Sequence, residues 1–426
     1  MGKLKAVLSV GAFAAVLAIL SFRVAIGMNV PGRILPDEWV FTDFRDAVYY
    51  PVVSFLSGEN PYEFEAYTKK YVVLCPFAPY SPLFLLVHSP FGLLPQETAQ
   101  LTHFVLSIVL SVGLAALCLK FCGQRPDVTT VCGLTALIMV SRPGQFNLLI
   151  GQTTLEFVFA VYVAIWTGSR VTSLAPFAVA AATMKPTFGF PLVILMVCQG
   201  RLRTVLTGLG AAAIATGAAM IPVARAAGGI PELIVSMWET YRNTPNLPAV
   251  DPVTSMERVD AVAFLSRLWG SPLGFGVELV VFTATMTAAG AALWHVHRRW
   301  DEESARLFNI SISCLAILLA VYQKQYGALL LTLPLASLAF GCWFKAGQSI
   351  SWTMRWTLLV LLAVPAVNFL AGWRALHHFE ERGLAWLTIT SVNGGALIIA
   401  FLLHLILAFS RKHGPSVQTP TEPPSS

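Results

Sequence analysis

The sequence predicts an all-α protein that spans a membrane many times, and three observations lead to this class. Of its 426 residues, 56% are hydrophobic and only 12% are charged, whereas a soluble domain carries about 25% charged residues. Several apolar runs exceed the roughly 18 residues that a helix needs to cross the hydrocarbon core of a bilayer. The basic residues are spread over many short connections between these runs. A very large soluble core does not account for apolar runs of this length, so we expect a bundle of transmembrane helices.

The charge and the cysteines argue against nucleic-acid binding and against a structural metal. A formal net charge of +6, spread along the chain, does not form the concentrated basic face that nucleic acid requires. The seven cysteines show no paired metal-ligand spacing, and most lie in apolar segments, where a buried thiol acts as a small hydrophobe. Cys118 and Cys122 would share a helix face, but no histidine or carboxylate accompanies them. The sequence names no cofactor with certainty and leaves the need for a divalent metal open.

Residues 5–29 form the first predicted span, and residues 30–80 form a long loop outside the cytoplasm. The span has no persuasive small-residue cleavage site, so a retained helix is favoured over a cleaved signal peptide. Residues 44–56 place apolar side chains on one side of a short helix. The aromatic residues between positions 62 and 71 are typical of a further helix at the membrane interface.

The rest of the chain supplies the other spans. Residues 80–95 contain three prolines and a glycine and are short for a crossing, so we expect a juxtamembrane or re-entrant segment that other helices cover. Eleven further apolar segments bring the total to about twelve spans, although several are shorter than the roughly 17 residues of a perpendicular crossing. They are residues 98–120, 128–141, 152–167, 171–184, 188–199, 203–224, 274–297, 304–321, 325–343, 354–372 and 384–409. Residues 225–270 form a second long outer loop, and residues 414–426 predict a disordered tail after a single transmembrane domain, residues 1–413.

The basic residues predict that both termini are cytoplasmic. If residues 80–95 do not cross, most short connections that carry lysine or arginine fall on the inside, as the positive-inside rule requires. The two long outer loops also carry basic residues, but they follow the rule only weakly. Three basic residues are exceptions, because they lie in short turns at the outer ends of apolar segments. These are Arg142, Lys185 and Lys324.

Asp43 and Asp46 are the candidate catalytic residues. They lie within one helical turn of each other, shortly after the first span, at the boundary between hydrocarbon and water. Partial desolvation there raises the pKa of a carboxyl group toward the value that a general base needs. The ordinary alternative is a solvated charge cluster with Arg45. Placement alone favours Asp43 over Asp46.

Arg142, Lys185 and Lys324 are the candidate ligands of a phosphate. An unpaired lysine at membrane depth is costly and marks a functional site by default, whereas Arg142 could instead extend to lipid head groups. Three cations beside apolar helices suit the phosphate of an anionic lipid, because a low dielectric strengthens charge-assisted hydrogen bonds. An ion-coupled transporter would be expected to carry several carboxylates inside its spans. Glu156 is the clearest one here, and so small a number is weak evidence against such a transporter.

Six further residues are candidates for contacts with the substrates. Pro143 and Gly144 break the chain between two spans, so the polar side chains beside them can face a cavity. In the second outer loop, an arginine and an aspartate either contact an acceptor or form an ion pair that only fixes the loop. A histidine in the last outer loop could assist proton transfer. The six candidates are Gln145, Asn147, Tyr326, Arg258, Asp260 and His377.

Five short motifs resemble those of glycosyltransferase family 87. They are Asp43-Phe-Arg-Asp-Ala-Val-Tyr-Tyr, Gly58-Glu-Asn-Pro-Tyr62, Tyr80-Ser-Pro-Leu83, Gly144-Gln-Phe-Asn147 and the Lys185-Pro186 pair. The motifs follow one another in the family's order over residues 40–200, and this shared order carries the resemblance. The later half of the chain is similar mainly in its pattern of spans.

The resemblance implies a GT-C fold and a membrane enzyme that uses polyprenyl-phosphate sugars. Characterised members of the family are mannosyl- and arabinofuranosyltransferases of bacterial envelope glycolipids and polysaccharides. By this likeness Asp43 is the catalytic carboxylate, and Tyr326 corresponds loosely to a tyrosine before a late span. The motif positions that line the donor cavity are Gln145, Asn147 and Lys185. The chain departs from some members at residues 323–325, which lack a histidine, and in the long outer loop, which lacks Asn-x-Ser, so the identity of the acceptor is left open.

We therefore expect an inverting glycosyltransferase in the plasma membrane, with its active site on the non-cytoplasmic face. The expected partners are a polyprenyl-phosphate sugar donor, a glycolipid or polysaccharide acceptor and membrane lipids, and no nucleic acid. The competing hypothesis is a membrane transporter or lipid flippase, which would share the spans and the cations but needs no general base.

Overall fold

The computed structural model describes residues 2–29, 40–77, 80–167, 174–243, 250–300, 302–343, 350–379 and 383–410. These residues form helices joined by turns, and the described ranges contain no β-strand beyond an isolated bridge between Arg258 and Lys324. The prediction of an all-α protein is confirmed. The predicted tail, residues 414–426, lies outside the described residues, as does the start of the first outer loop, residues 30–39.

Six helices of the described chain are long and apolar enough to cross a membrane. Twenty helical residues reach about 30 Å, which is the thickness of the hydrocarbon core. The six are α1 (Gly2–Gly27), α6 (Gln96–Phe121), α12 (Leu202–Ala227), α15 (Gly274–Arg299), α18 (Trp352–Val367, extended by the turn η4, Phe369–Ala371) and α20 (Leu384–Ser410). The class of multispanning membrane protein is thereby confirmed.

The other predicted spans also coincide with helices, but with shorter ones. They are α7 (Val128–Val140), α9 (Thr154–Thr167), α10 (Leu174–Thr183), α11 (Pro186–Cys198), α16 (Glu302–Ala320) and the pair η3 (Gln325–Leu331) and α17 (Thr332–Ala339). A helix of 13 residues is about 20 Å long. Length and hydropathy together support six of the roughly twelve predicted spans. α5 (Pro82–Gly92) has 11 residues and is too short to cross alone, which agrees with the expected juxtamembrane or re-entrant segment.

The break between α7 and α8 (Arg142–Ile150) falls at Ser141 rather than at Pro143. The Ser141 hydroxyl accepts a hydrogen bond from the Gly144 N–H at 3.1 Å and caps α8. Pro143 therefore lies in the first turn of α8, where its missing N–H leaves no bond unmade. Gly144 is required by a close approach, because a Cβ there would lie 1.8 Å from the carbonyl oxygen of Ile138.

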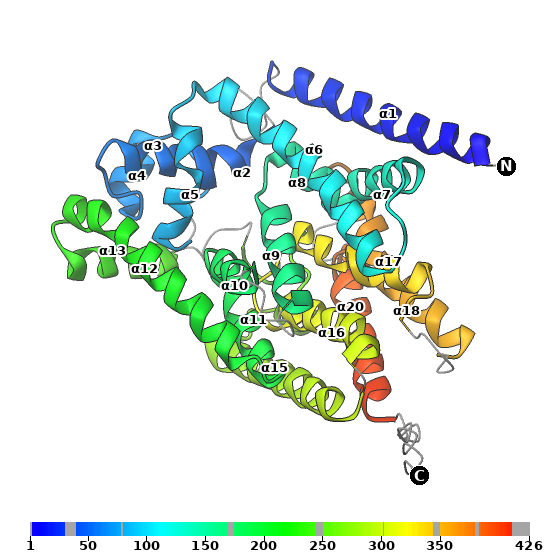
Figure 1. Cartoon of the computed structure of the whole chain (residues 1–426). Helices are drawn as coiled ribbons and strands as arrows, with labels where there is room; N and C mark the ends of the chain where they lie inside the picture. The colour runs from blue at the N-terminus through cyan, green and yellow to red at the C-terminus, as the bar shows by residue number, and fades with distance from the viewer. Residues whose placement is uncertain are drawn as a thin grey trace, which may run out of the picture.

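The two long outer loops fold into short helices that contact each other. The first contains α2 (Thr42–Phe44), the π-helical turn η1 (Arg45–Tyr49), α3 (Tyr50–Leu56) and α4 (Phe64–Lys70), and the second contains α13 (Ile230–Asn243) and α14 (Ala261–Trp269). The Thr240 hydroxyl donates to the Tyr62 carbonyl oxygen at 2.8 Å, and the Asn60 amide donates to Ser236 at 3.3 Å. In Figure 1, α2 to α5 gather at one end of the molecule beside α12 and α13. The two loops that the sequence assigns to one side of the membrane thus lie together.

α13 turns an apolar face outward. Ile230, Ile234, Trp238 and Tyr241 are each 50–58% exposed, and they recur at helical spacing. Glu232 and Glu239 lie between them in the sequence, and Arg242 follows Tyr241. A helix with this pattern is suited to the membrane interface.

α16 lies at the centre of the bundle. Every residue from 310 to 320 is buried, and the helix packs against α11, α15 and α20. By contrast, α1 lies at the edge of the molecule and packs on α7 (Figure 1). One apolar cluster includes buried residues from α1 through α20, so the described helices share a continuous core.

Candidate active site

An uncommon backbone conformation sets the position of Asp43. Phe41 has φ +56°, in the left-handed region, which costs a non-glycine residue about 1–2 kcal/mol. Its ring is fully buried, and its N–H donates to the Leu149 carbonyl oxygen at 2.8 Å, so packing holds it there. Asp43 follows in α2, which passes directly into the π-helical turn η1. Such conformations concentrate at functional sites.

Gly151 and Gln152 bring the end of α8 against Asp43. Gly151 has φ +73°, and a Cβ on it would lie 2.5 Å from the Cβ of Phe44. The side chain of Gln152 donates a hydrogen bond to the Asp43 carboxylate. The predicted carboxylate Asp43 and the polar segment that follows Pro143 are therefore neighbours. The sequence places Gln152 just beyond the polar residues 141–147, but it does not indicate that Gln152 contacts Asp43.

The Asp43 carboxyl group is half-buried and lies within electrostatic reach of several charges. Burial raises its pKa above the ordinary 3.8. Lys324, the hydrogen bond from Gln152 and Lys185 oppose this rise, and Glu257 adds to it. The net effect is a carboxylate that is more basic than an ordinary aspartate, which is the property of a general base.

Asp46 is engaged with the loop that follows α4. Its Oδ2 accepts hydrogen bonds from the N–H groups of Leu74, at 2.7 Å, and Cys75, at 3.3 Å, and its Oδ1 lies 3.4 Å from the Nε of Arg45. Burial raises the pKa of Asp46 to about 7, against the opposing effects of Arg45 and Leu74. Both carboxylate oxygens thus have donors, so the geometry favours Asp43 over Asp46 for proton transfer. A catalytic part for Asp46 stays a prediction.

Lys185 is a buried cation surrounded by aromatic rings. It is 6% exposed, and its Nζ has no hydrogen-bond partner among the described residues. The ring centroids lie 4.9 Å (Tyr326), 5.2 Å (Phe188), 5.6 Å (Phe157) and 5.7 Å (Tyr80) from Nζ. We call Lys185 and the residues of these four rings the Lys185 box. Cation–π attraction stabilises the ammonium in part, yet burial lowers the pKa of Lys185, in the turn between α10 and α11, to about 7.

Lys324 is a cation with a partner. Its Nζ lies 3.2 Å from the Oε2 of Glu257, and its backbone forms the isolated bridge with Arg258. Burial disfavours its charge, but the Glu257 carboxylate keeps the pKa of Lys324 above its ordinary value. Much of the Lys324 charge is therefore already balanced, unlike that of Lys185.

The three predicted residues of α8 differ in their contacts. The Arg142 guanidinium lies 4.9 Å from the Phe146 ring, and its Nε has no partner within the described ranges. Gln145 accepts a hydrogen bond from Arg23 of α1 at 2.9 Å and so ties α1 to α8. Asn147 is fully buried, and neither of its amide atoms has a partner in the described part of the chain. An amide with both ends unpaired suits a polar ligand, and the place of these residues in a donor cavity stays a prediction.

Arg258 and Asp260 form a bidentate ion pair with N–O distances of 2.9 and 2.8 Å. Asp260 also caps α14 through the Ala263 N–H, at 3.0 Å, and accepts from the Gln323 N–H at 3.3 Å. The pair therefore fastens the second outer loop to the turn that carries Lys324. Of the two alternatives for this pair, the geometry favours fixing the loop over contacting an acceptor.

Tyr326 and His377 have opposite surroundings. Tyr326 belongs to the Lys185 box, and its ring stacks on Phe146 with centroids 6.3 Å apart. His377 is exposed just after α19 (Trp373–Leu376), with its ring centroid 3.8 Å from that of His378. Among the residues described, no three His, Cys, Asp or Glu side chains form a group that could hold a metal ion. The structure thus brings Asp43, Lys185, Lys324 and Tyr326 to one region, whereas His377 is at the surface.

Several partners in this region carry no sequence signal. Phe157 and Phe188 resemble any apolar helix residue, yet their rings surround Lys185. Glu257 is one of many loop carboxylates, yet it pairs with Lys324. Glu156, the carboxylate inside a predicted span, pairs with His88 of α5 at 3.1 Å, 68 positions earlier. These contacts depend on the folded arrangement of distant segments, which local patterns do not encode.

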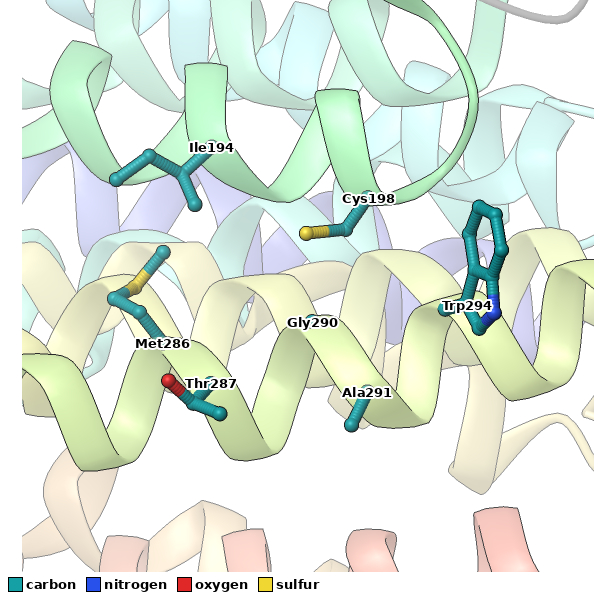
Figure 2. A pocket seen from close by; sticks show the side chains of 7 residues that line it. All are labelled: Ile194, Cys198, Met286, Thr287, Gly290, Ala291 and Trp294. Carbon is teal, nitrogen blue, oxygen red and sulfur yellow. The ribbon is translucent and has the colours of Figure 1, made fainter.

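A groove of about 410 Å³ lies between α11 and α15, apart from these residues (Figure 2). Its lining is Ile194, Cys198, Met286, Thr287, Gly290, Ala291 and Trp294. None of the candidate catalytic or phosphate-binding residues lines it. Its mostly apolar lining suits hydrocarbon. Ile194 lies on α11 nine residues after Lys185, which is about 14 Å along the helix.

Comparisons with known proteins connect the chain to a described family. A family model for glycosyltransferase family 87 matches residues 77–321. No curated protein and no solved structure matches the chain. The matched range includes Arg142, Lys185 and Glu257 and begins after Asp43.

Proposed function

The chain belongs to glycosyltransferase family 87, whose model matches more than half of it, and on that premise we propose that this membrane glycosyltransferase uses a polyprenyl-phosphate sugar as its donor. The sugar is mannose or arabinofuranose, and the acceptor is an envelope glycolipid or polysaccharide. The reaction takes place at the non-cytoplasmic face of the plasma membrane and inverts the anomeric configuration.

One observation carries this proposal. A half-buried, basic carboxyl group, Asp43, lies within electrostatic reach of Lys185, a buried ammonium that has no hydrogen-bond partner in the described chain. A general base beside an anion-seeking cation is the set of groups that transfer from a phosphate-linked donor requires. Because Asp43 precedes the matched range, its assignment depends on these contacts.

The proposed reaction is a single displacement. The acceptor oxygen attacks the anomeric carbon as Asp43 takes its proton, and a new C–O bond forms. The bond between that carbon and the phosphate oxygen breaks, and the electron pair leaves with the polyprenyl phosphate. A phosphate is a good leaving group, so the reaction needs cations to stabilise its growing charge rather than a general acid.

Three cations share this stabilisation in the proposal, but not equally. Lys185 contributes most, because no described carboxylate forms an ion pair with its ammonium, as Glu257 does with that of Lys324. Arg142 is half-buried, with its guanidinium against Phe146, and assists from α8. Residues 80–95 and the interfacial helices of the first outer loop admit the polyprenyl tail sideways from the bilayer.

Asp43→Asn tests the proposal, with Asp127→Asn as the matched control. Asp127 is an exposed N-cap of α7, and asparagine caps a helix as well as aspartate does. We expect Asp43→Asn to fold and to bind donor but to lose transfer by about 10²–10⁴-fold, the usual contribution of a general base. The measurement is transfer of labelled sugar from a polyprenyl-phosphate donor in proteoliposomes, together with thermal unfolding.

If the Asp43→Asn variant transfers sugar as fast as the Asp127→Asn variant does, Asp43 is not the general base. Sealed vesicles distinguish the flippase hypothesis, because a flippase moves labelled lipid between leaflets without forming a new glycoside.

A further inference from the structure

Three helices begin beside the ammonium of Lys185. α11 starts at Pro186, directly after Lys185, and α5 starts at Pro82. The Ser81 N–H donates to the Met184 carbonyl oxygen at 3.0 Å, so the starts of α5 and α11 are side by side. α9 joins them through Phe157, a ring of the Lys185 box that lies in its first turn.

The start of a helix is electropositive. Its first N–H groups have no partner within the helix, and the helix dipole places about half a positive charge there. Neither α5 nor α11 has a side-chain cap on these groups. Three such starts around a buried ammonium would repel it unless an anion were bound, and such helix starts are known anion sites. The arrangement therefore favours an anion more strongly than Lys185 alone.

Two hydroxyl groups in this region also have no partner among the residues described. Ser81 stands at the N-cap of α5, but its hydroxyl makes no capping bond and is buried. Thr154, the first residue of α9, is fully buried, and its hydroxyl is unpaired as well. Buried hydroxyls are rarely left without a hydrogen bond. Both can donate one to an anion.

We propose that the hydroxyls of Ser81 and Thr154 bind the donor phosphate together with Lys185 and the starts of α5, α9 and α11. This inference rests on the proposed function and adds two ligands to its phosphate site. Gln152, which hydrogen-bonds Asp43, is two residues before Thr154, so the phosphate and the base flank the place of the sugar.

Binding of farnesyl phosphate to the full-length protein in detergent tests the inference, with farnesol as the ligand that lacks the phosphate. The removing variants are Ser81→Ala and Thr154→Val, and the matched controls Ser81→Thr and Thr154→Ser keep the hydroxyl. We expect each removing variant to weaken farnesyl phosphate binding about tenfold, since a hydrogen bond to a charged group is lost. The controls should stay within about twofold of the wild type, and farnesol binding should not change.

The readouts separate the possible failures. Unchanged farnesyl phosphate affinity in both removing variants overturns the inference. A loss of farnesol affinity equal to the loss of farnesyl phosphate affinity also overturns it. The variants would then act through the fold or through contacts with the isoprenoid chain, and not through the phosphate. Sugar transfer in the same preparations tests the proposed function separately. Hydroxyl-dependent phosphate binding without transfer would reject the function and keep the site, and transfer without hydroxyl dependence would reject the site and keep the function.

Discussion

Asp43 and Lys185 have pKa values that shift toward each other for one reason. Burial disfavours the charged form of either group, so it raises the pKa of the acid and lowers that of the amine. The proposed reaction needs both groups charged, Asp43 to take a proton and Lys185 to bind phosphate. The active fraction of the protein is therefore greatest at a pH between the two values.

We predict a bell-shaped pH profile for sugar transfer at donor concentrations well below saturation. The rate should rise with pH as Asp43 ionises, at a higher pH than an ordinary aspartate would require. It should fall above the Lys185 pKa of about 7, by about fivefold from pH 7 to pH 8, because only the protonated amine binds phosphate. Initial rates across pH 5 to 9, about four units, measure both limbs.

Lys185→Arg identifies the alkaline limb. A guanidinium stays charged over this range, so the fall above neutral pH should disappear even if the absolute rate is lower. An unaltered alkaline limb in Lys185→Arg would assign that limb to another group.

At the scale of helices, the site depends on how the end of α8 meets α2. Gly151 allows the approach, and the next residue bonds the Asp43 carboxylate. A side chain at position 151 would have to displace Phe44, and with it the neighbouring Asp43. Gly58 has the same φ of +73°, but a Cβ added there would meet nothing within 4 Å, which provides a matched comparison.

We predict that Gly151→Ala is more harmful than Gly58→Ala. Both substitutions place an alanine in the left-handed region, at a cost of about 1–2 kcal/mol. Only Gly151→Ala adds an overlap with Phe44, so it should unfold at a lower temperature and lose at least about tenfold in transfer. Thermal unfolding and transfer rates of the two variants check this, and equal losses in both would show that the contact with Phe44 is unimportant.

The positions of the helices were more predictable from the sequence than the contacts between side chains of distant segments. Apolar length and proline positions predict the short α5 and the apolar helices between α6 and α20, because these signals are local. They do not predict α8, which the sequence presents as a break between two spans. The bond between Gln152 and Asp43 joins residues 109 positions apart, and the Lys185 box draws its rings from four separate segments. Such contacts follow from tertiary packing, so the sequence indicates which charged groups are unusual but not which groups surround them.

At the scale of the whole molecule, Asp43, Lys185 and Lys324 lie together with the two long outer loops. The second loop reaches the first through Thr240 and Tyr62 and reaches Lys324 through Glu257. The charge pattern predicts that this side is non-cytoplasmic. The family match and the apolar helices support a membrane enzyme, and the orientation stays a prediction.

Labelling of introduced cysteines with a membrane-impermeant maleimide tests the orientation. Lys69 of α4 and Arg203 of α12 are both exposed, and the predicted topology puts them on opposite sides. We expect Lys69→Cys to react in intact cells and Arg203→Cys to react only after permeabilisation. The wild-type protein is the control, because it shows how strongly the native cysteines are labelled. The reverse pattern would place Asp43 on the cytoplasmic side.

The outward apolar face of α13 has a consequence for the donor site. Thr240 of α13 holds the carbonyl of Tyr62, and the Tyr62 hydroxyl donates to the carbonyl oxygen of Tyr80 at 2.7 Å, whose ring flanks Lys185. A helix whose exposed face is suited to the lipid surface is thereby connected, through two hydrogen bonds, to the wall of the Lys185 box. We therefore expect that a change in bilayer thickness that shifts α13 also shifts Tyr80 beside Lys185.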